Sequence, residues 1–269
     1  MKDKPIISII TIVYNDKNNL EKTILSVVNQ IQNSIEYIVI DGGSSDGTVD
    51  IIKQNSKLLS FWLSEKDKGI SDAFNKGVLH ANGEFILFLN AGDVMTENAI
   101  LNMLLSVKSK TSDIYYGSAI CRIKDKTGFR FKAIPAKDFN LIHPFLCHQA
   151  IFCKAALFDE IGLFDTHLRF AMDYDWYLKC VLKNKILTIV DSDLVYYSLG
   201  GTSDQNIIKA LEECRDVALK HGFDYNKTNS FYRKKIFKAK LQIIFNKIGI
   251  GWIPIKIKSI YKKQYNFIK

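Results

Sequence analysis

Short apolar runs alternate with helical patterns through the first third of the chain, and no other feature constrains the fold as strongly. The runs have the length of buried strands, and the segments between them carry apolar side chains at helical spacing. In chain order we expect these strands and helices at 5–13, 18–30, 36–40, 49–54, 61–64, 69–81 and 85–89. In the helix over 69–81, Ala73, Val78 and Leu79 should face the core. The alternation predicts an α/β fold with a doubly wound, mostly parallel central sheet and flanking helices.

Polar residues follow several of these runs where the chain turns. Asp41 ends the second run, and the apolar run 85–89 breaks into Asn-Ala-Gly-Asp at 90–93. Open α/β sheets bind ligands at the carboxyl ends of parallel strands, so these polar groups predict one shared crevice. Asp93 and Asp41 are equally consistent with turn or helix-capping residues, and spacing alone leaves both alternatives open.

The pattern after residue 93 is less regular. We expect strands at 113–122, 129–134, 150–153, 185–190 and 193–198, helices at 99–107, 155–161, 173–183 and 206–221, and a loop at 200–203. Asp173 and Asp175 then lie at the start of a helix, where the helix dipole favours carboxylates whatever their function.

Composition excludes several classes of protein. Apolar content of 47% and charged content of 24% are typical of a globular protein. The five cysteines are scattered without a C-x-x-C pair, which favours reduced thiols in the cytoplasm and gives no support for a zinc site. No uninterrupted apolar stretch approaches the ~18 residues of a membrane span, and we interpret the N-terminal apolar run as a strand rather than a signal peptide.

The net charge of +9 belongs to the C-terminal tail. Residues 225–269 contain 12 Lys or Arg and no Asp or Glu, so the rest of the chain is slightly acidic. Apolar residues recur at helical spacing in this basic tail, which suits the surface of an anionic membrane. The alternative is a helix that packs on the main domain with its lysines in water. No nucleic-acid-binding motif accompanies the charge, so we expect no nucleic-acid partner.

Five segments, taken in order, resemble the inverting family 2 glycosyltransferases of the GT-A fold. They are Ile-Thr-Ile-Val-Tyr-Asn at 10–15, Ile-Asp-Gly-Gly-Ser-Ser-Asp-Gly-Thr at 40–48, Ser-Glu-Lys-Asp-Lys-Gly-Ile-Ser-Asp-Ala-Phe-Asn at 64–75, Leu-Asn-Ala-Gly-Asp at 89–93 and Ala-Met-Asp-Tyr-Asp-Trp at 171–176. The pattern is most similar to bacterial enzymes that build surface polysaccharides such as lipopolysaccharide or capsule. The resemblance implies a glycosyltransferase domain over 1–222, with a nucleotide-sugar-binding half at 1–107 and an acceptor half at 108–222, followed by a basic helical tail at 223–269.

The resemblance also implies roles for individual residues. Asp173 stands at the position of the catalytic base, and Asp93 at the metal-binding D-x-D motif, for Mn²⁺ or Mg²⁺. Asp41 stands where the family reads the uracil of the donor. The full set implied to bind the nucleotide sugar is Thr11, Val13, Tyr14, Asn15, Asp41, Asp67, Lys68, Asp72, Asn75, Asn90, Ala91 and Gly92. The acceptor-side candidates are His148, Gln149, Asp175 and Trp176.

Plainer interpretations stand beside these roles: Lys68 as a solvated side chain, His148 as a structural histidine and Trp176 as a core residue. The chain departs from the family pattern twice, because Asp93 is the only carboxylate of its motif and Gly42 replaces a second aspartate common in that loop. The expected activity is inverting transfer of a UDP-linked sugar to a saccharide or lipid-linked saccharide acceptor at the inner face of the membrane. The alternative is a non-catalytic protein that binds nucleotide sugars or saccharides.

Overall fold

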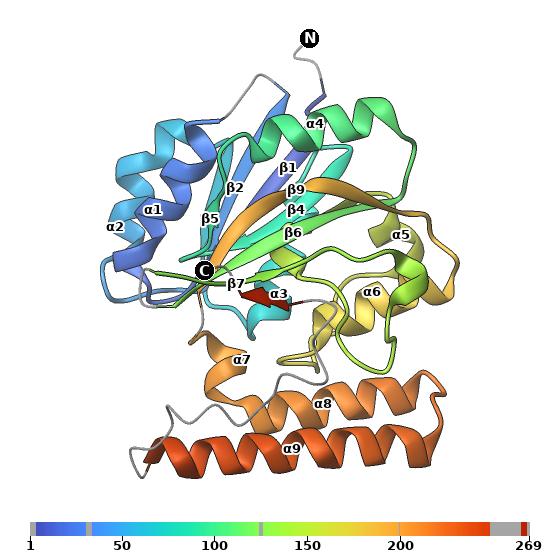
Figure 1. Ribbon diagram of the computed structural model, residues 1–269. Helices are drawn as coiled ribbons and strands as arrows, with labels where there is room; N and C mark the ends of the chain where they lie inside the picture. Colours follow the sequence, from blue (N-terminus) through green and yellow to red (C-terminus); the bar gives the residue numbers. More distant parts are fainter. Residues whose placement is uncertain (1–3, 31–33, 124–125, 199, 248–264, 268–269) are drawn as a thin grey trace.

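The computed structural model describes residues 4–30, 34–123, 126–198, 200–247 and 265–267 (Figure 1). Its first half contains β1 (Ile7–Val13), α1 (Lys17–Val28), β2 (Ile35–Asp41), α2 (Thr48–Asn55), β3 (Phe61–Ser64), α3 (Ile70–His80), β4 (Phe85–Asn90), β5 (Val94–Met95) and α4 (Ala99–Ser109). The second half contains β6 (Ile114–Ile123), β7 (Lys126–Phe131), β8 (Ile151–Lys154), α5 (Leu157–Ile161), α6 (Met172–Leu182), β9 (Leu187–Ser198), α7 (Thr202–Gln205), α8 (Ile207–Lys220), α9 (Tyr225–Lys247) and β10 (Tyr265–Phe267). Short 3-10 turns lie at 56–58, 136–138 and 148–150.

The strands form one sheet in the order β10-β7-β6-β8-β4-β1-β2-β3, with β9 beside β6 and β5 beside β9. Pairs among β1, β2, β3 and β4 are parallel, and β8 is antiparallel to both β4 and β6, so β6 runs in the same direction as β4. The register places Val13 opposite Asp41, and Ile12 opposite Asn90. The carboxyl ends of β1, β2 and β4 therefore meet at one edge of the sheet, as the sequence predicts.

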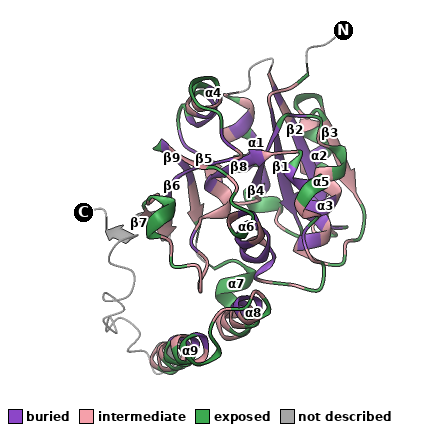
Figure 2. Ribbon diagram, turned by 90° about the vertical axis from the view of Figure 1, so that its right-hand side faces the viewer, coloured by how far each residue is buried: buried purple, intermediate pink, exposed green. Residues whose placement is uncertain are grey.

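Helices cover both faces of the sheet, and the core has two layers. Helices α1, α2 and α4 pack on the face that carries Ile9, Val39 and Leu87. Helices α3, α5 and α6 lie on the opposite face, with Ile10 and Phe88, and α8 packs on α6. Because alternate side chains of β1 and β4 enter opposite layers, both strands are buried on both faces (Figure 2). This explains why they are continuous apolar runs in the sequence, and it confirms the doubly wound fold.

Three local predictions were wrong. Leu79 is 72% exposed, because α3 approaches β1 through Gly77, where a Cβ would come within 2.4 Å of the Ile10 side chain. One strand, β9, replaces the two strands expected over 185–198. Its register against β6 shifts at the acidic stretch that suggested a break between two strands. Residues 202–205 form α7 rather than a loop.

The tail begins as a helix that packs on the protein. Helix α9 lies beside α8 (Figure 1), and its Tyr232 is fully buried. Lys235, expected in water, is also buried, whereas Phe237 and Ile244 are more than half exposed. The packed-helix alternative therefore describes this part of the tail. In the sequence, helical spacing of apolar residues resumes at 255–261, and this predicted segment lies outside the described residues.

Candidate active site

The loop after β1 and the loop after β2 are joined by Asn15. Its backbone N–H donates to Ser44 Oγ at 2.7 Å, and its Oδ1 accepts from the N–H of Ser45 at 2.9 Å. Asn15 adopts a left-handed conformation, with φ 49°, which asparagine tolerates. Tyr14, next to it, is 65% exposed and free to contact a ligand. The other predicted residues of this strand, Thr11 and Val13, are buried within the sheet.

Asp41 is fully buried and its carboxylate bonds to its own loop. It accepts hydrogen bonds from the N–H groups of Gly43 and Ser44 and from the hydroxyls of Ser44 and Ser64. These four bonds make Asp41 the brace of the loop 42–46, and its predicted contact with uracil stays a prediction.

Gly42 brings Asp67 close to this loop. A Cβ at Gly42 would lie 2.2 Å from Asp67 Oδ2 and 3.4 Å from the Tyr14 ring. Asp67 Oδ1 accepts from the N–H of Gly69 at 2.9 Å, which holds its carboxylate in place. Burial raises the pKa of Asp67, and repulsion from Asp72 and Asp41 adds to the rise. The glycine that departs from the family pattern therefore makes room for a neighbouring carboxylate.

The remaining predicted residues of this segment serve mainly the structure. Asp72 accepts from the N–H of Lys68 and lies 3.4 Å from Lys76 Nζ. The amide of Asn75 is buried and bonds at both ends to the backbone of Phe164, each at 2.9 Å. Lys68 is exposed. The structure thus brings Tyr14, Asn15 and Asp67 together against the loop after β2, but not Asn75.

The turn after β4 presents two buried oxygens without hydrogen-bond partners among the described residues. These are Asn90 Oδ1 and Asp93 Oδ2, and Asp93 is only 6% exposed. The turn is fixed by Thr23 of α1, whose Oγ1 accepts from the N–H of Gly92 and donates to the carbonyl of Asp93. The N–H of Ala91 donates to Ile12 O in β1. Backbone groups thus shape the turn, and the two side-chain oxygens remain available.

Burial raises the pKa of Asp93 to about 6. The neighbouring charge of His148 and a hydrogen bond from the side chain of Gln149 oppose this rise. Both neighbours were predicted only for the acceptor side. Their 3-10 turn, 148–150, instead lies directly against the Asn90–Asp93 turn.

His148 connects that turn to Asp173. Its Nε2 lies 3.1 Å from Asn90 Nδ2, and its Nδ1 lies 3.4 Å from Asp173 Oδ2. His148 thus lies between the amide of Asn90 and the carboxylate of Asp173, with Nδ1 facing the carboxylate. The candidate metal ligand and the candidate base, 80 residues apart in the sequence, are therefore joined through one side chain.

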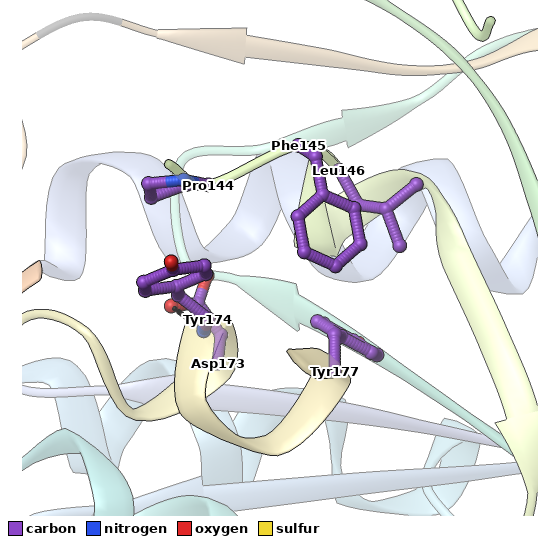
Figure 3. Close-up of a pocket in the computed structure, with 6 residues that line it drawn as sticks. All are labelled: Pro144, Phe145, Leu146, Asp173, Tyr174 and Tyr177. Carbon is purple, nitrogen blue, oxygen red and sulfur yellow. Dashed lines mark hydrogen bonds between the residues drawn. The ribbon is translucent and has the colours of Figure 1, made fainter. Parts of the chain in front are cut away.

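Asp173 lies on the first turn of α6 and lines a small pocket with Tyr174 and Tyr177 of the same helix (Figure 3). Pro144, Phe145 and Leu146, on the loop before β8, form the facing wall. The side chain of Asp173 is 25% exposed, so a ligand can reach it. The pocket is thus mainly apolar and aromatic, with one carboxylate.

Asp175 and Trp176 lie outside this group. Two residues along a helix turn the side chain by about 200°, so Asp175 points away from the Asp173 side. It is 1% exposed and lies 2.8 Å from His221 Nε2 and 2.6 Å from Lys179 Nζ. Trp176 is buried in the core and donates to Gly162 O. Both acceptor-side assignments are therefore corrected, since these side chains stabilise α6 from within the protein.

A divalent cation fits the donor atoms of the β4 turn only in part. Carboxylate and amide oxygens are ligands that Mg²⁺ and Mn²⁺ prefer, and Asp93 Oδ2 and Asn90 Oδ1 are of this type. In the described part of the chain, no group of three or more His, Cys, Asp or Glu side chains could hold a metal. Phosphate oxygens and water would complete the shell, as is usual for Mg²⁺.

The sequence profile named Glycosyl transferase family 2 matches residues 8–159. The chain belongs to this family. A PGL/p-HBAD biosynthesis glycosyltransferase from Mycobacterium bovis is 32% identical over 76% of this family 2 chain and 82% of its own length. The chain is thus a glycosyltransferase.

Two solved structures share the GT-A fold with this glycosyltransferase. TarS residues 1–349 from S. aureus, in complex with UDP-GlcNAc, superpose with a TM-score of 0.63 at 16% identity, over 94% of this chain and 77% of that one. The mannosyltransferase PcManGT from Pyrobaculum calidifontis, in complex with GDP-Man and Mn²⁺, gives 0.64 at 17% identity, over 88% and 69%. This chain spans 46% of the longer TarS chain.

The sequence motifs pointed to Asp93, Asn90 and Asp173, but they gave weaker signals for two neighbours of these residues and none for a third. His148 and Gln149 were predicted by position for the acceptor side, and the sequence did not indicate their contacts with the Asn90–Asp93 turn. Thr23 carries no signal, because a threonine within a helical pattern does not show which turn it will contact.

Proposed function

We propose that this glycosyltransferase moves a sugar from a UDP-linked donor to a saccharide or lipid-linked saccharide, with inversion at the anomeric carbon and with Asp173 as the general base. The observation that carries the proposal is the series Asp93, Asn90, His148 and Asp173. Two oxygens on a strand-end turn have no hydrogen-bond partner among the described residues, and one imidazole lies between this turn and an accessible carboxylate. Residues 1–107 would form the donor half and 108–222 the acceptor half.

The donor would bind across the strand ends, with its diphosphate near residues 90–93. Asp93 Oδ2 and Asn90 Oδ1 would hold Mn²⁺ or Mg²⁺, which would neutralise the charge that develops on the departing diphosphate. TarS with UDP-GlcNAc and PcManGT with GDP-Man and Mn²⁺ support a nucleotide-sugar donor and a divalent metal. Tyr14 and Asp67 line the crevice beside the loop that Asp41 braces.

Inverting transfer needs one base and no enzyme nucleophile. The acceptor hydroxyl attacks the anomeric carbon, the bond from that carbon to the phosphate oxygen breaks, and the hydroxyl proton passes to Asp173. His148 Nδ1 faces Asp173 Oδ2 and would hold the carboxylate in a fixed orientation. The aromatic wall of Tyr174 and Tyr177 would contact the acceptor (Figure 3).

The basic tail would bring the enzyme to the inner face of an anionic membrane, where lipid-linked acceptors of surface polysaccharides lie. The exposed Phe237 and Ile244 on α9 support this proposal. None of the described helices is long and apolar enough to cross a membrane. Binding to phosphatidylserine vesicles but not to duplex DNA at the same salt would support the membrane role, and the reverse result would favour nucleic acid.

A non-catalytic binding protein is the second candidate, because Asp93 is the only carboxylate of its motif. Nucleotide release from UDP-GlcNAc, UDP-glucose, UDP-galactose and GDP-mannose, with Mn²⁺, would separate the two functions. We expect turnover of at least one donor, lost in Asp173→Asn while UDP still binds. Binding of UDP without turnover of any donor would favour the second candidate, and no response to any nucleotide would refute both.

A further inference from the structure

Glu213 of α8 binds the backbone directly before the helix that carries Asp173. Its carboxylate accepts hydrogen bonds from three successive N–H groups, those of Arg169 at 2.9 Å, Phe170 at 2.5 Å and Ala171 at 2.7 Å. N–H groups at the start of a helix have no partner within the helix. One charged side chain from elsewhere in the chain therefore fixes the entry into α6.

A second contact from the end of α8 reaches α6 on the other side of Asp173. His221, the residue after α8, lies 2.8 Å from Asp175 Oδ1, and Asp175 is almost fully buried. Residues 169–171 and residue 175 flank the candidate base in the chain. Helix α8 thus restrains the first turn of α6 both before and after Asp173.

Helix α9 contacts the facing wall of the pocket. Tyr232 donates its hydroxyl proton to Ile142 O at 2.8 Å, and Lys235 Nζ lies 3.0 Å from His143 Nε2. The next three residues, 144–146, form the wall opposite Asp173 (Figure 3). Because α8 and α9 pack side by side (Figure 1), one helical hairpin contacts both walls of the acceptor side.

We propose that Glu213 is a positioning residue, which acts through the N–H groups of 169–171 to place Asp173, and that the α8–α9 hairpin thereby sets the geometry of the acceptor side. The inference rests on the proposed role of Asp173 as the base. Bonds from N–H groups to a carboxylate are about twice as strong as neutral ones, so they can hold a helix start firmly. A displacement of ~1 Å at a reacting group can lower the rate ~100-fold.

The test is Glu213→Gln in the full chain, with Glu212→Gln as the matched control. The glutamine amide keeps one acceptor oxygen, but its NH2 group faces backbone N–H groups that need an acceptor. Glu212 is the exposed neighbour on the same helix. We expect kcat for nucleotide release, on the donor that the wild type turns over fastest, to fall ~10- to 100-fold in Glu213→Gln. We expect the KM for that donor and the Kd for UDP to change less than ~2-fold. Amide hydrogen exchange at 169–171 should quicken in this variant alone.

A folded Glu213→Gln protein with wild-type kcat would overturn the inference, as would an equal loss in Glu212→Gln. A purely structural role would lower the melting temperature but leave kcat per UDP-binding site unchanged. If Glu213→Gln does not fold, Glu213→Asp is the test, because it keeps the charge but has a side chain that is shorter by one methylene. An unchanged kcat in Glu213→Asp would then overturn the inference. Asp173→Asn separates the two proposals: activity in that variant refutes the proposed base, whereas an inactive Asp173→Asn beside a fully active Glu213→Gln refutes only the positioning role.

Discussion

Removing the charge of Asp93 should stabilise the metal-free protein. Burial raises the pKa of Asp93 to about 6 in the folded chain, against an ordinary value of 3.8. The folded state therefore binds this proton more tightly than the unfolded state. Below pH 3.8 Asp93 does not destabilise the folded state, and the destabilisation grows as the pH rises toward 6. Above that it is constant at about 3 kcal/mol.

Asp93→Asn has the same shape without the charge, so it should remove this cost. In EDTA we expect it to be more stable than the wild type by up to about 3 kcal/mol at pH 7.5 and by about half as much at pH 5. At roughly 2–4 °C per kcal/mol, the melting temperature at pH 7.5 rises by several degrees. Differential scanning calorimetry at both pH values measures the difference.

The exposed Asp191 supplies the control, because Asp191→Asn should leave the melting temperature unchanged. Mn²⁺ with UDP should stabilise the wild type and leave Asp93→Asn unaffected, because the metal compensates the buried charge only where the carboxylate is present. The prediction fails if the melting temperature of Asp93→Asn at pH 7.5 is equal to or lower than that of the wild type. It also fails if the difference in melting temperature is not smaller at pH 5.

Three further predictions test the site and the tail. His148→Asn, whose amide can take the place of Nδ1 opposite Asp173, should keep a kcat ~10-fold above that of His148→Gln, measured as nucleotide release. Gly42→Ala should lower the free energy of unfolding by about 1–3 kcal/mol in urea titrations and weaken UDP binding, because its Cβ would meet Asp67 Oδ2 at 2.2 Å. Phe237→Asp, at a side chain 63% exposed on α9, should weaken binding to phosphatidylserine vesicles by ~10-fold or more in sedimentation assays.

A specific result would contradict each of these three predictions. Equal kcat in the Asn and Gln variants would remove His148 from the placement of the base. Gly201→Ala, where nothing lies within 4 Å, should be neutral, and an equally neutral Gly42→Ala would show that Asp67 moves aside freely. An equal loss of vesicle binding in Leu79→Asp, on the exposed side of α3, would show that the tail is not the membrane-binding surface.

Periodicity predicted the first half of the fold because local and global signals agree there. The strands β1 and β4 are buried on both faces, so they are mainly apolar runs in the sequence. The turns after them lie at the edge of the sheet, and they carry polar residues. Leu79 shows the limit of this approach: its spacing fits an inward face, but the close approach at Gly77 sets the rotation of α3.

The candidate site shows the same division. Short motifs found Asp93 and Asp173, since each lies at a fixed point of a strand end or a helix start. The position in the family motif favoured Asp173 over Asp175 as the base. Only the packing shows that Asp175 meets His221 and Lys179 inside the protein.

The sequence by itself determined the fold class, the crevice at the strand ends, the family and the two candidate carboxylates, because each is written in residues that are close together in the chain. Only the tertiary structure decided that His148 lies between Asn90 and Asp173, and that Glu213 holds the start of α6. Such contacts join residues 25 to 58 positions apart. No local pattern records which distant side chain will satisfy a given N–H group, because the folding of the chain around its core makes that choice.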